Sequence, residues 1–161
     1  MFRRVPGRGG VALLSAAVAL SVLCLGAGQP RAQDEDKPYE VQEDGTVDWY
    51  TFSGFRRYHA ECHVCHGPDG LGSSFAPALT ESLERMDYDQ FLDIVVNGRQ
   101  NVGTASDNVM PAFGMNRNVM CFIDDLYAYL KARSDGAVPR GRPKHEAKPE
   151  EARERDDACM G

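Results

Sequence analysis

The chain has 161 residues, 42% of them hydrophobic, and a formal net charge of −6 from 18 basic and 24 acidic residues. This length predicts one domain with extensions, and the content of aliphatic and aromatic residues excludes a wholly disordered chain. The acidic balance argues against a nucleic-acid-binding protein. Only one long uncharged apolar stretch occurs, at the N-terminus, which excludes a multi-span membrane protein.

The first 33 residues have the pattern of a secretory signal peptide. Three arginines precede apolar residues 11–25, and small residues with glycine and proline follow. We expect cleavage between Ala27 and Gln33 and export to the periplasm, where cysteine pairs can oxidise. The alternative is an uncleaved N-terminal anchor, although the apolar stretch is shorter than the ~20 residues of a membrane-spanning helix. Removal of residues 1–33, which contain four arginines and no acid, leaves a net charge of −10.

The remaining chain divides into three zones by composition. Residues 34–48 hold seven acids and one lysine, and we interpret them as a solvated acidic arm. Residues 49–135 carry nearly all large apolar side chains and are expected to form the domain. Residues 136–161 form a polar tail with three prolines, a composition typical of disorder, except that Cys159 lies near its end.

The central zone shows helical periodicity and no convincing strand alternation. Apolar residues recur every three or four positions over 52–62, which predicts an amphipathic helix. A second helix is expected after Asp87, which forms a capping-box pattern with Gln90, and it should stop at Gly98. A third helix is predicted over about 118–134. The expected fold is therefore all-α, with a core too thin to be filled by these helices alone.

Residues Cys62-His63-Val64-Cys65-His66 form a C-x-x-C-H sequence, the attachment motif of a c-type haem. Two cysteines at this spacing on a helical turn point the same way, so both can form thioethers to one porphyrin. His66 follows directly and can reach the iron. One covalently bound haem c would also supply the apolar body that the core lacks.

Three other interpretations of the motif find less support. A thioredoxin-like redox pair requires a βαβ pattern, which is missing here. A zinc site requires a second close ligand pair, but Cys121 and Cys159 are 38 residues apart. A simple disulfide within the motif leaves the adjacent histidine unexplained.

A second axial ligand would separate electron transfer from substrate chemistry. Met110 is the preferred candidate, because it precedes a proline in a loop 44 residues after His66. Met115 is the second choice, and Met120 is expected to pack in the core. The other candidates are methionines and histidines elsewhere in the chain, namely Met86, Met160, His59, His63 and His145.

Residues 49–133 resemble a small monohaem class I cytochrome c. The resemblance is carried by an aromatic-bearing helix and a closing helix, and by four segments between them: Cys62–His66, Phe75–Leu79, Asn97–Arg99 and Met110–Phe113. It implies that the Pro77 carbonyl accepts the Nδ1 proton of His66 and that Arg99 neutralises a haem propionate. The stretch from Gln100 to Val109 is longer than in many members, which puts the reach of Arg99 in doubt.

The mature chain is also similar to the four-cysteine cytochromes c associated with methanol metabolism. That likeness is carried by Cys121, Cys159 and the tail. Two cysteines left over in an oxidising compartment most simply pair with each other, which would tether the tail to the last helix. The alternatives are two free thiols or an intermolecular disulfide.

The resemblance implies a monomeric periplasmic one-electron carrier rather than a catalyst, with a quinoprotein alcohol dehydrogenase as donor and a cytochrome or oxidase as acceptor. The acidic charge would steer such a carrier toward a basic partner surface. One alternative is a haem enzyme or sensor in which the Gln100–Val109 insertion lifts Met110 away from the iron. Another is an accessory haem subunit of a dehydrogenase or oxidase complex.

Overall fold

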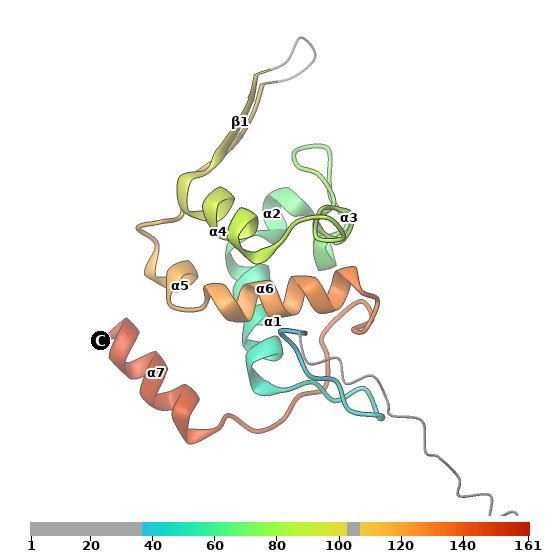
Figure 1. Cartoon of the computed structure of the whole chain (residues 1–161), viewed down its shortest axis with the longest axis vertical. Coiled ribbons are helices and arrows are strands. Elements are labelled where there is room, and N and C mark those ends of the chain that lie inside the picture. Colours follow the sequence, from blue (N-terminus) through green and yellow to red (C-terminus); the bar gives the residue numbers. More distant parts are fainter. Residues whose placement is uncertain (1–36, 103–106) are drawn as a thin grey trace, which may run out of the picture. The chain divides into compact units, whose positions relative to one another are not determined.

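A computed structural model describes residues 37–102 and 107–161 (Figure 1). All of them belong to the compact unit Asp34–Gly161, whereas the predicted signal peptide lies outside the described residues. In the described ranges, no helix combines the length and apolar character needed to cross a membrane. The elements in chain order are α1 (Trp49–Glu61), α2 (His63–His66), the 3₁₀ turn η1 (Pro68–Gly70), α3 (Leu79–Ser82), α4 (Tyr88–Asn97), β1 (Arg99–Val102), β2 (Asp107–Met110), α5 (Arg117–Met120), α6 (Ile123–Ser134) and α7 (Glu150–Met160).

The centre of the domain is the crossing of α1 and α6 (Figure 1). Helix α1 begins three residues before the predicted start, because the Asp48 side chain caps it by accepting from the Thr51 N–H at 2.9 Å. At the crossing, a Cβ on Gly54 would lie 1.8 Å from the Asp125 carbonyl oxygen. Only glycine therefore lets the two backbones approach so closely.

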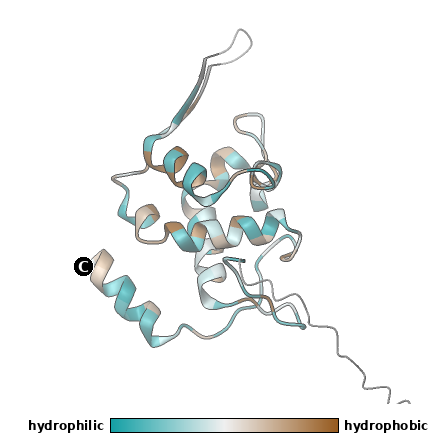
Figure 2. Cartoon of the chain, in the orientation of Figure 1, coloured by the Kyte–Doolittle hydropathy of each residue, from teal (hydrophilic) through white to brown (hydrophobic). Residues whose placement is uncertain are grey.

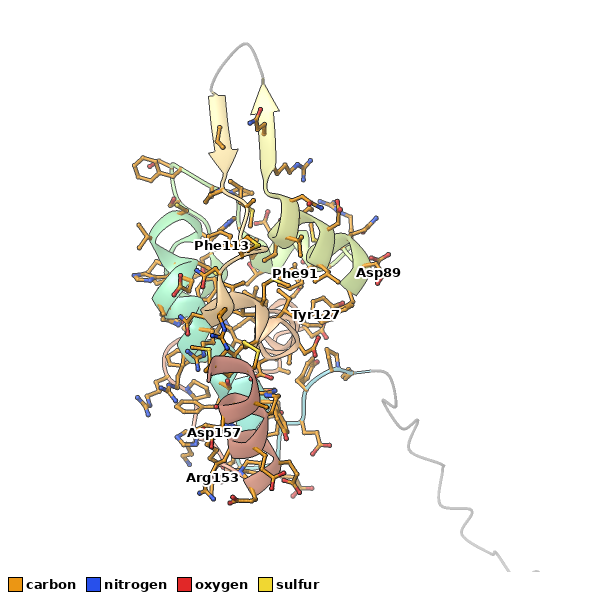
Figure 3. All side chains as sticks on the ribbon, turned by 90° about the vertical axis from the view of Figure 1, so that its left-hand side faces the viewer. Asp89, Phe91, Phe113, Tyr127, Arg153 and Asp157 are labelled. Carbon is orange, nitrogen blue, oxygen red and sulfur yellow. A yellow bond between two sulfur atoms is a disulfide. The ribbon has the colours of Figure 1, made fainter. Side chains whose placement is uncertain are left out.

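The predicted capping-box helix is confirmed as α4. Asp87 accepts from the Gln90 N–H at 2.8 Å, and the Gln90 side chain accepts from the Asp87 N–H. Phe91 and Val95 on its buried face join the main hydrophobic cluster with residues of α1 and α6. Phe91 on α4 and Tyr127 on α6 point toward each other in Figure 3, with ring centroids 5.3 Å apart.

The predicted third helix is broken into α5 and α6. Phe122 leaves helical geometry with φ −133° and ψ 24°, and its side chain is buried. The guanidinium of Arg57 lies 3.6 Å from the centre of its ring. Burial of this aromatic side chain between α1 and α6 outweighs continuation of one helix, a tertiary effect that periodicity does not reveal.

The insertion after Arg99 forms an antiparallel ribbon of β1 and β2, which the sequence did not predict as strands. In its register, Arg99 pairs with Met110 and Val102 pairs with Asp107. The ribbon extends away from the helices in Figure 1. Backbone pairing between neighbouring segments stabilises it, so the alternating apolar pattern of a half-buried strand is not required.

The interpretation of residues 34–48 as a solvated arm is wrong for the side chains of Tyr39 and Val47, which are buried. The polar tail runs beside this arm: the Val47 N–H donates to Lys144 O, and the Glu146 N–H donates to Val47 O, both at 3.0 Å. A second hydrophobic cluster joins arm, helices and tail, and it includes Phe52 and Val138. The arm and the tail therefore stabilise each other.

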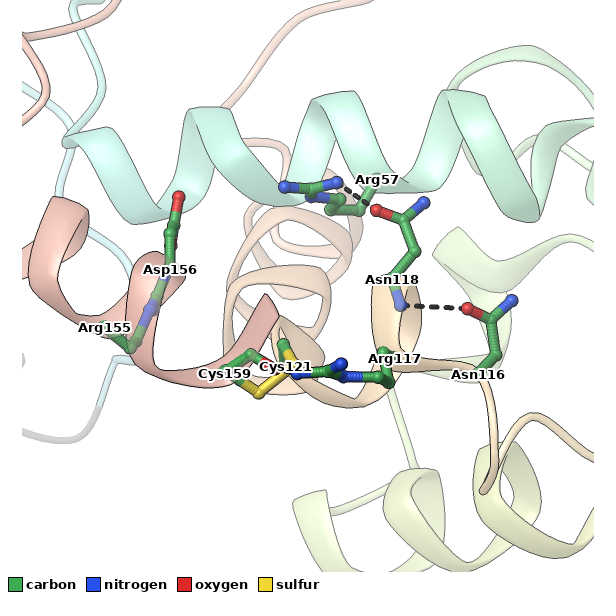
Figure 4. The surroundings of a disulfide bond; sticks show 8 residues. All are labelled: Arg57, Asn116, Arg117, Asn118, Cys121, Arg155, Asp156 and Cys159. Carbon is green, nitrogen blue, oxygen red and sulfur yellow. Dashed lines mark hydrogen bonds and ion pairs between the residues drawn. A yellow bond between two sulfur atoms is a disulfide. The ribbon is translucent and has the colours of Figure 1, made fainter. Parts of the chain in front are cut away.

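The tail is ordered and ends in α7, which is mostly hydrophilic in Figure 2. A disulfide joins Cys159 on α7 to Cys121 between α5 and α6 (Figure 4). The guanidinium of Arg155 binds the carboxylate of Asp125 through two hydrogen bonds of 2.8 Å, and the Asp125 side chain is only 1% exposed. These cross-links explain why a segment with few apolar side chains is ordered.

Candidate functional site

The C-x-x-C-H motif lies at the junction of α1 and α2. Cys62 ends α1, and the N–H groups of Cys65 and His66 both donate to its carbonyl oxygen, at 3.2 and 3.0 Å. This single helical turn brings both thiols to one cavity, which the His66 imidazole also lines. The structure thus brings together the three motif residues that the sequence predicted.

His66 is held in one orientation by the segment that follows it. Its Nδ1 lies 3.0 Å from the Pro77 carbonyl oxygen, and the side chain is 8% exposed. Since a carbonyl oxygen only accepts, Nδ1 must carry the proton, which leaves Nε2 with a free lone pair. The loop that carries Pro77 is positioned through Gly72, whose N–H donates to His66 O at 2.7 Å. A histidine oriented in this way is prepared to bind a metal.

Met110, at the end of β2, lines the same cavity. Of the other methionine candidates, Met86 also lines the cavity, whereas Met115 is 97% exposed and Met120 packs against the core. The remaining candidates lie outside the cavity lining among the described residues: Met160, His59, His63 and His145. The insertion forms a ribbon that leaves Met110 in the cavity wall.

This cysteine-lined cavity has a volume of about 460 Å³, within the range of about 300–1,000 Å³ typical of sites for small molecules and cofactors. Most of its lining is apolar, and charge comes from Glu61 and Arg99. The complete lining is Glu61, Cys62, Cys65, His66, Phe75, Ala76, Pro77, Leu79, Ser82, Met86, Ile94, Arg99, Val109, Met110, Pro111 and Phe113. Two thiols, an oriented imidazole and a thioether in an apolar cavity are a donor set that fits haem c.

The environment of Cys62 does not fit a redox-active thiol pair. Burial, with smaller contributions from Glu61 and Cys65, raises the pKa of the Cys62 thiol to about 12. Thiol–disulfide exchange requires the opposite, a lowered pKa that exposes a thiolate. In the described part of the chain, no three His, Cys, Asp or Glu side chains group so that they could hold a metal ion.

Several lining residues were not singled out by the sequence. Ile94 belongs to α4, and Ser82 belongs to the short helix α3. Val109, 64% exposed, lines the cavity as well. Phe75, 71% exposed, also lines it, and it belongs to the Phe75–Leu79 segment that carried the family resemblance. Phe113, labelled in Figure 3, belongs to the Met110–Phe113 segment that carried the family resemblance.

Comparisons with known proteins identify relatives of this chain. A family model described as cytochrome C oxidase, cbb3-type, subunit III matches residues 52–130. Cytochrome c-553I from Paracoccus denitrificans is 59% identical over 128 residues, which cover 78% of this chain and 57% of the relative. Cytochrome c-555 from Methylococcus capsulatus is 45% identical over 96 residues, covering 59% of this chain and 72% of the relative.

The fold has a solved counterpart. The crystal structure of the c-type cytochrome XoxG from Methylobacterium extorquens AM1 matches with a TM-score of 0.65 and 47% sequence identity. The match covers 77% of this chain and 82% of that structure. The expected small class I cytochrome c fold is thereby confirmed.

This chain belongs to the c-type cytochromes, a family defined by covalently bound haem c. Its relatives include cytochromes from Methylobacterium extorquens and Methylococcus capsulatus. The relatives are named as cytochromes, which agrees with the expectation of a carrier rather than a catalyst. The chain spans just over half the length, 57%, of cytochrome c-553I.

Proposed function

We propose that the protein is a periplasmic one-electron carrier. Cys62 and Cys65 would hold the haem through thioethers, and His66 and Met110 would bind its iron. The haem supplies reversible one-electron oxidation and reduction of its iron when bound. The observation that carries this proposal is the oriented His66 imidazole in a cavity that also contains both thiols and the Met110 thioether.

The residues around the cavity would adjust the reduction potential of the haem. The Pro77 carbonyl fixes the tautomer of His66 and increases the basicity of Nε2. A thioether ligand on the other side favours the reduced state and raises the reduction potential. Arg99 lines the cavity beside Met110 in the ribbon register, which supports a role in neutralising a propionate.

The alternative of a haem enzyme or sensor requires an open or weak distal position. The ribbon supports the carrier instead, because it absorbs the insertion outside the helical domain while Met110 stays in the cavity wall. Exposed Phe75 and Val109 beside the cavity offer an apolar contact for a brief encounter with a redox partner.

Carbon monoxide binding to the ferrous holoprotein tests the axial ligands. We expect the wild type to resist carbon monoxide and Met110→Ala to bind it stoichiometrically. Met86→Ala is the matched control, because it also removes a thioether from the cavity, and it should still resist the gas. Binding by the wild type would favour the enzyme or sensor, and binding by Met86→Ala alone would transfer the ligand role to Met86.

For the partners, we propose a quinoprotein methanol or alcohol dehydrogenase as donor and a cytochrome or terminal oxidase as acceptor. The similarity to XoxG and to cytochrome c-555 of a Methylococcus supports this assignment. Stopped-flow mixing of the ferric protein with such a dehydrogenase and its alcohol should reduce the haem in a second-order reaction. The rate should fall as salt is added if the acidic surface steers the encounter. Stable co-purification at moderate salt would favour the accessory-subunit alternative.

A further inference from the structure

A second cavity, which we call the aromatic cleft, is formed where the acidic arm and the polar tail meet the helical domain. Its volume is about 710 Å³, larger than that of the cysteine-lined cavity. Its walls come from residues 37–40 and 48–50, from α4 and α6, and from residues 146–155 of the tail. Much of this wall lies outside the segment 52–130 that the family model matches. Among the described residues, the two cavities share no lining residue.

The lining of the aromatic cleft contains more acidic than basic side chains: Lys37 and Arg155 face the carboxylates of Glu40, Asp48, Asp124, Asp125 and Glu146. The Asp125 carboxylate is neutralised by Arg155, as described above. Asp48, Asp124 and Glu146 accept hydrogen bonds only from uncharged groups, and within the described ranges no lysine or arginine lies at ion-pair distance from them. A concave surface lined by carboxylates concentrates a negative potential and attracts cations.

The aromatic walls suit a cation with an aliphatic stem. The Tyr88 ring packs edge-on against Tyr127 at 5.1 Å, and its hydroxyl donates to Asp124. Elsewhere in the cleft, the chain's own cations already lie over such rings, with the Arg155 guanidinium 5.0 Å from the centre of Tyr50. No cation of the described residues lies over Tyr88 or Tyr127. This corner therefore combines two half-buried tyrosine rings with a carboxylate.

We propose that the aromatic cleft docks a lysine- or arginine-bearing segment of a partner protein. The carboxylates would pair with the charged group, and the rings would pack against its aliphatic stem and bind it through cation–π contacts. A basic partner is complementary to a chain with an excess of acidic residues. Because the cleft and the cysteine-lined cavity have separate linings, a partner docked there leaves the redox site accessible. The inference does not depend on the axial ligands.

Peptide binding in the cleft can be followed at Trp49, because this single tryptophan of the chain lines the cleft. Its buried indole N–H has no hydrogen-bond partner among the described residues. The probe is acetyl-tetralysine amide, titrated into ¹⁵N-labelled ferrous holoprotein. We expect the one indole cross-peak to shift and saturate, while acetyl-tetraglutamine amide leaves it unchanged.

The double variant Asp124→Asn, Glu146→Gln keeps the hydrogen-bond acceptors and removes two charges. We expect it to weaken tetralysine binding about fivefold, the effect of losing two partly exposed ion pairs. The control Glu43→Gln, Glu84→Gln removes the same charge from exposed positions outside both linings and should change affinity less than twofold.

Three results would overturn the proposal. An indole cross-peak that does not move excludes docking in the cleft. Equal weakening in both double variants means that only the overall charge attracts the peptide. Saturation by methylammonium chloride at the same concentration as tetralysine identifies a site for small amines rather than for a protein partner.

Discussion

The cysteine-lined cavity and the aromatic cleft are built in different ways within one chain. Every described residue that lines the first comes from positions 61–113, and its reactive groups are set by one helical turn and one proline loop. The cleft requires residues of the arm and of the tail, brought together by strand-like pairing, an ion pair and a disulfide. The redox site should therefore be insensitive to changes in the arm and tail, whereas the cleft should depend on them.

Removing the disulfide should cause the largest loss of unfolding free energy, and it should affect the cleft without affecting the redox site. In the chain-entropy model, closing a loop across 38 residues contributes about 4 kcal/mol. The variant Cys121→Ser, Cys159→Ser should lose up to this amount of unfolding free energy in guanidinium denaturation of the holoprotein. Its visible spectrum and reduction potential should match those of the wild type, while tetralysine binding weakens.

Non-reducing mass spectrometry of the purified wild type provides the starting check, and it should detect a peptide containing both Cys121 and Cys159. Alkylation of Cys159 without reduction would contradict the disulfide. A shift in the reduction potential of the double-serine variant would contradict the inference that the redox site is insensitive to changes in the tail.

A smaller effect is expected when Arg155 is replaced by methionine. The change leaves the buried Asp125 carboxylate unpaired, which typically costs 3–5 kcal/mol. Because the Arg155 side chain is 33% exposed, we expect a loss of about 2 kcal/mol at neutral pH. Arg153→Met is the matched control: Arg153 is 54% exposed and pairs with the exposed Glu150, so its loss should stay below about 0.5 kcal/mol.

The loss in Arg155→Met should depend on pH. Burial raises the pKa of Asp125 in the wild type, although hydrogen bonds from Arg155 and Ser53 act in the opposite direction. Removing Arg155 should raise that pKa further. A carboxyl group with a higher pKa in the folded than in the unfolded state stabilises the fold as the pH decreases toward the folded-state pKa. The deficit measured by denaturation should therefore shrink from neutral to mildly acidic pH, and a deficit that grows would contradict this account.

The cysteine-lined cavity and the aromatic cleft also differ in how much of each could be predicted from the sequence. The spacing of Cys62, Cys65 and His66 is local, and Met110 and Pro77 belong to short segments, so sequence and resemblance together placed them in one site. The capping box of α4 was predicted for the same reason: its two partners are three residues apart. Local patterns are informative when the interaction itself is local.

The arm, the tail and the helix break were missed because their stabilising contacts join distant residues. Val47 has few apolar neighbours in sequence, and its burial depends on backbone pairing with residues near His145. The break at Phe122 depends on burial of its ring beneath Arg57 of α1, a contact that exists only in the folded domain. The ribbon likewise arises from pairing across the insertion rather than from an apolar alternation.

The smallest expected effect on stability comes from Gly72, in the loop that follows His66, and Gly45 in the arm serves as its matched control. Both have left-handed backbone, with φ values of +80° and +81°. A Cβ on Gly72 would lie 2.7 Å from the Ala78 nitrogen, whereas a Cβ on Gly45 meets nothing within 4 Å. Gly45→Ala should lose about 1 kcal/mol from backbone strain. Gly72→Ala should lose somewhat more, because the Ala78 backbone must also shift.

Only Gly72→Ala should also change the redox properties. Its Cβ would press on the loop that presents the Pro77 carbonyl to His66 Nδ1, lengthening a 3.0 Å hydrogen bond. A weaker bond reduces the basicity of the other imidazole nitrogen, which stabilises the ferric state less and raises the reduction potential. Spectroelectrochemistry should detect this shift in Gly72→Ala and an unchanged potential in Gly45→Ala. If the two variants share one potential, the Pro77 contact does not tune the site, and strain at a left-handed residue explains both.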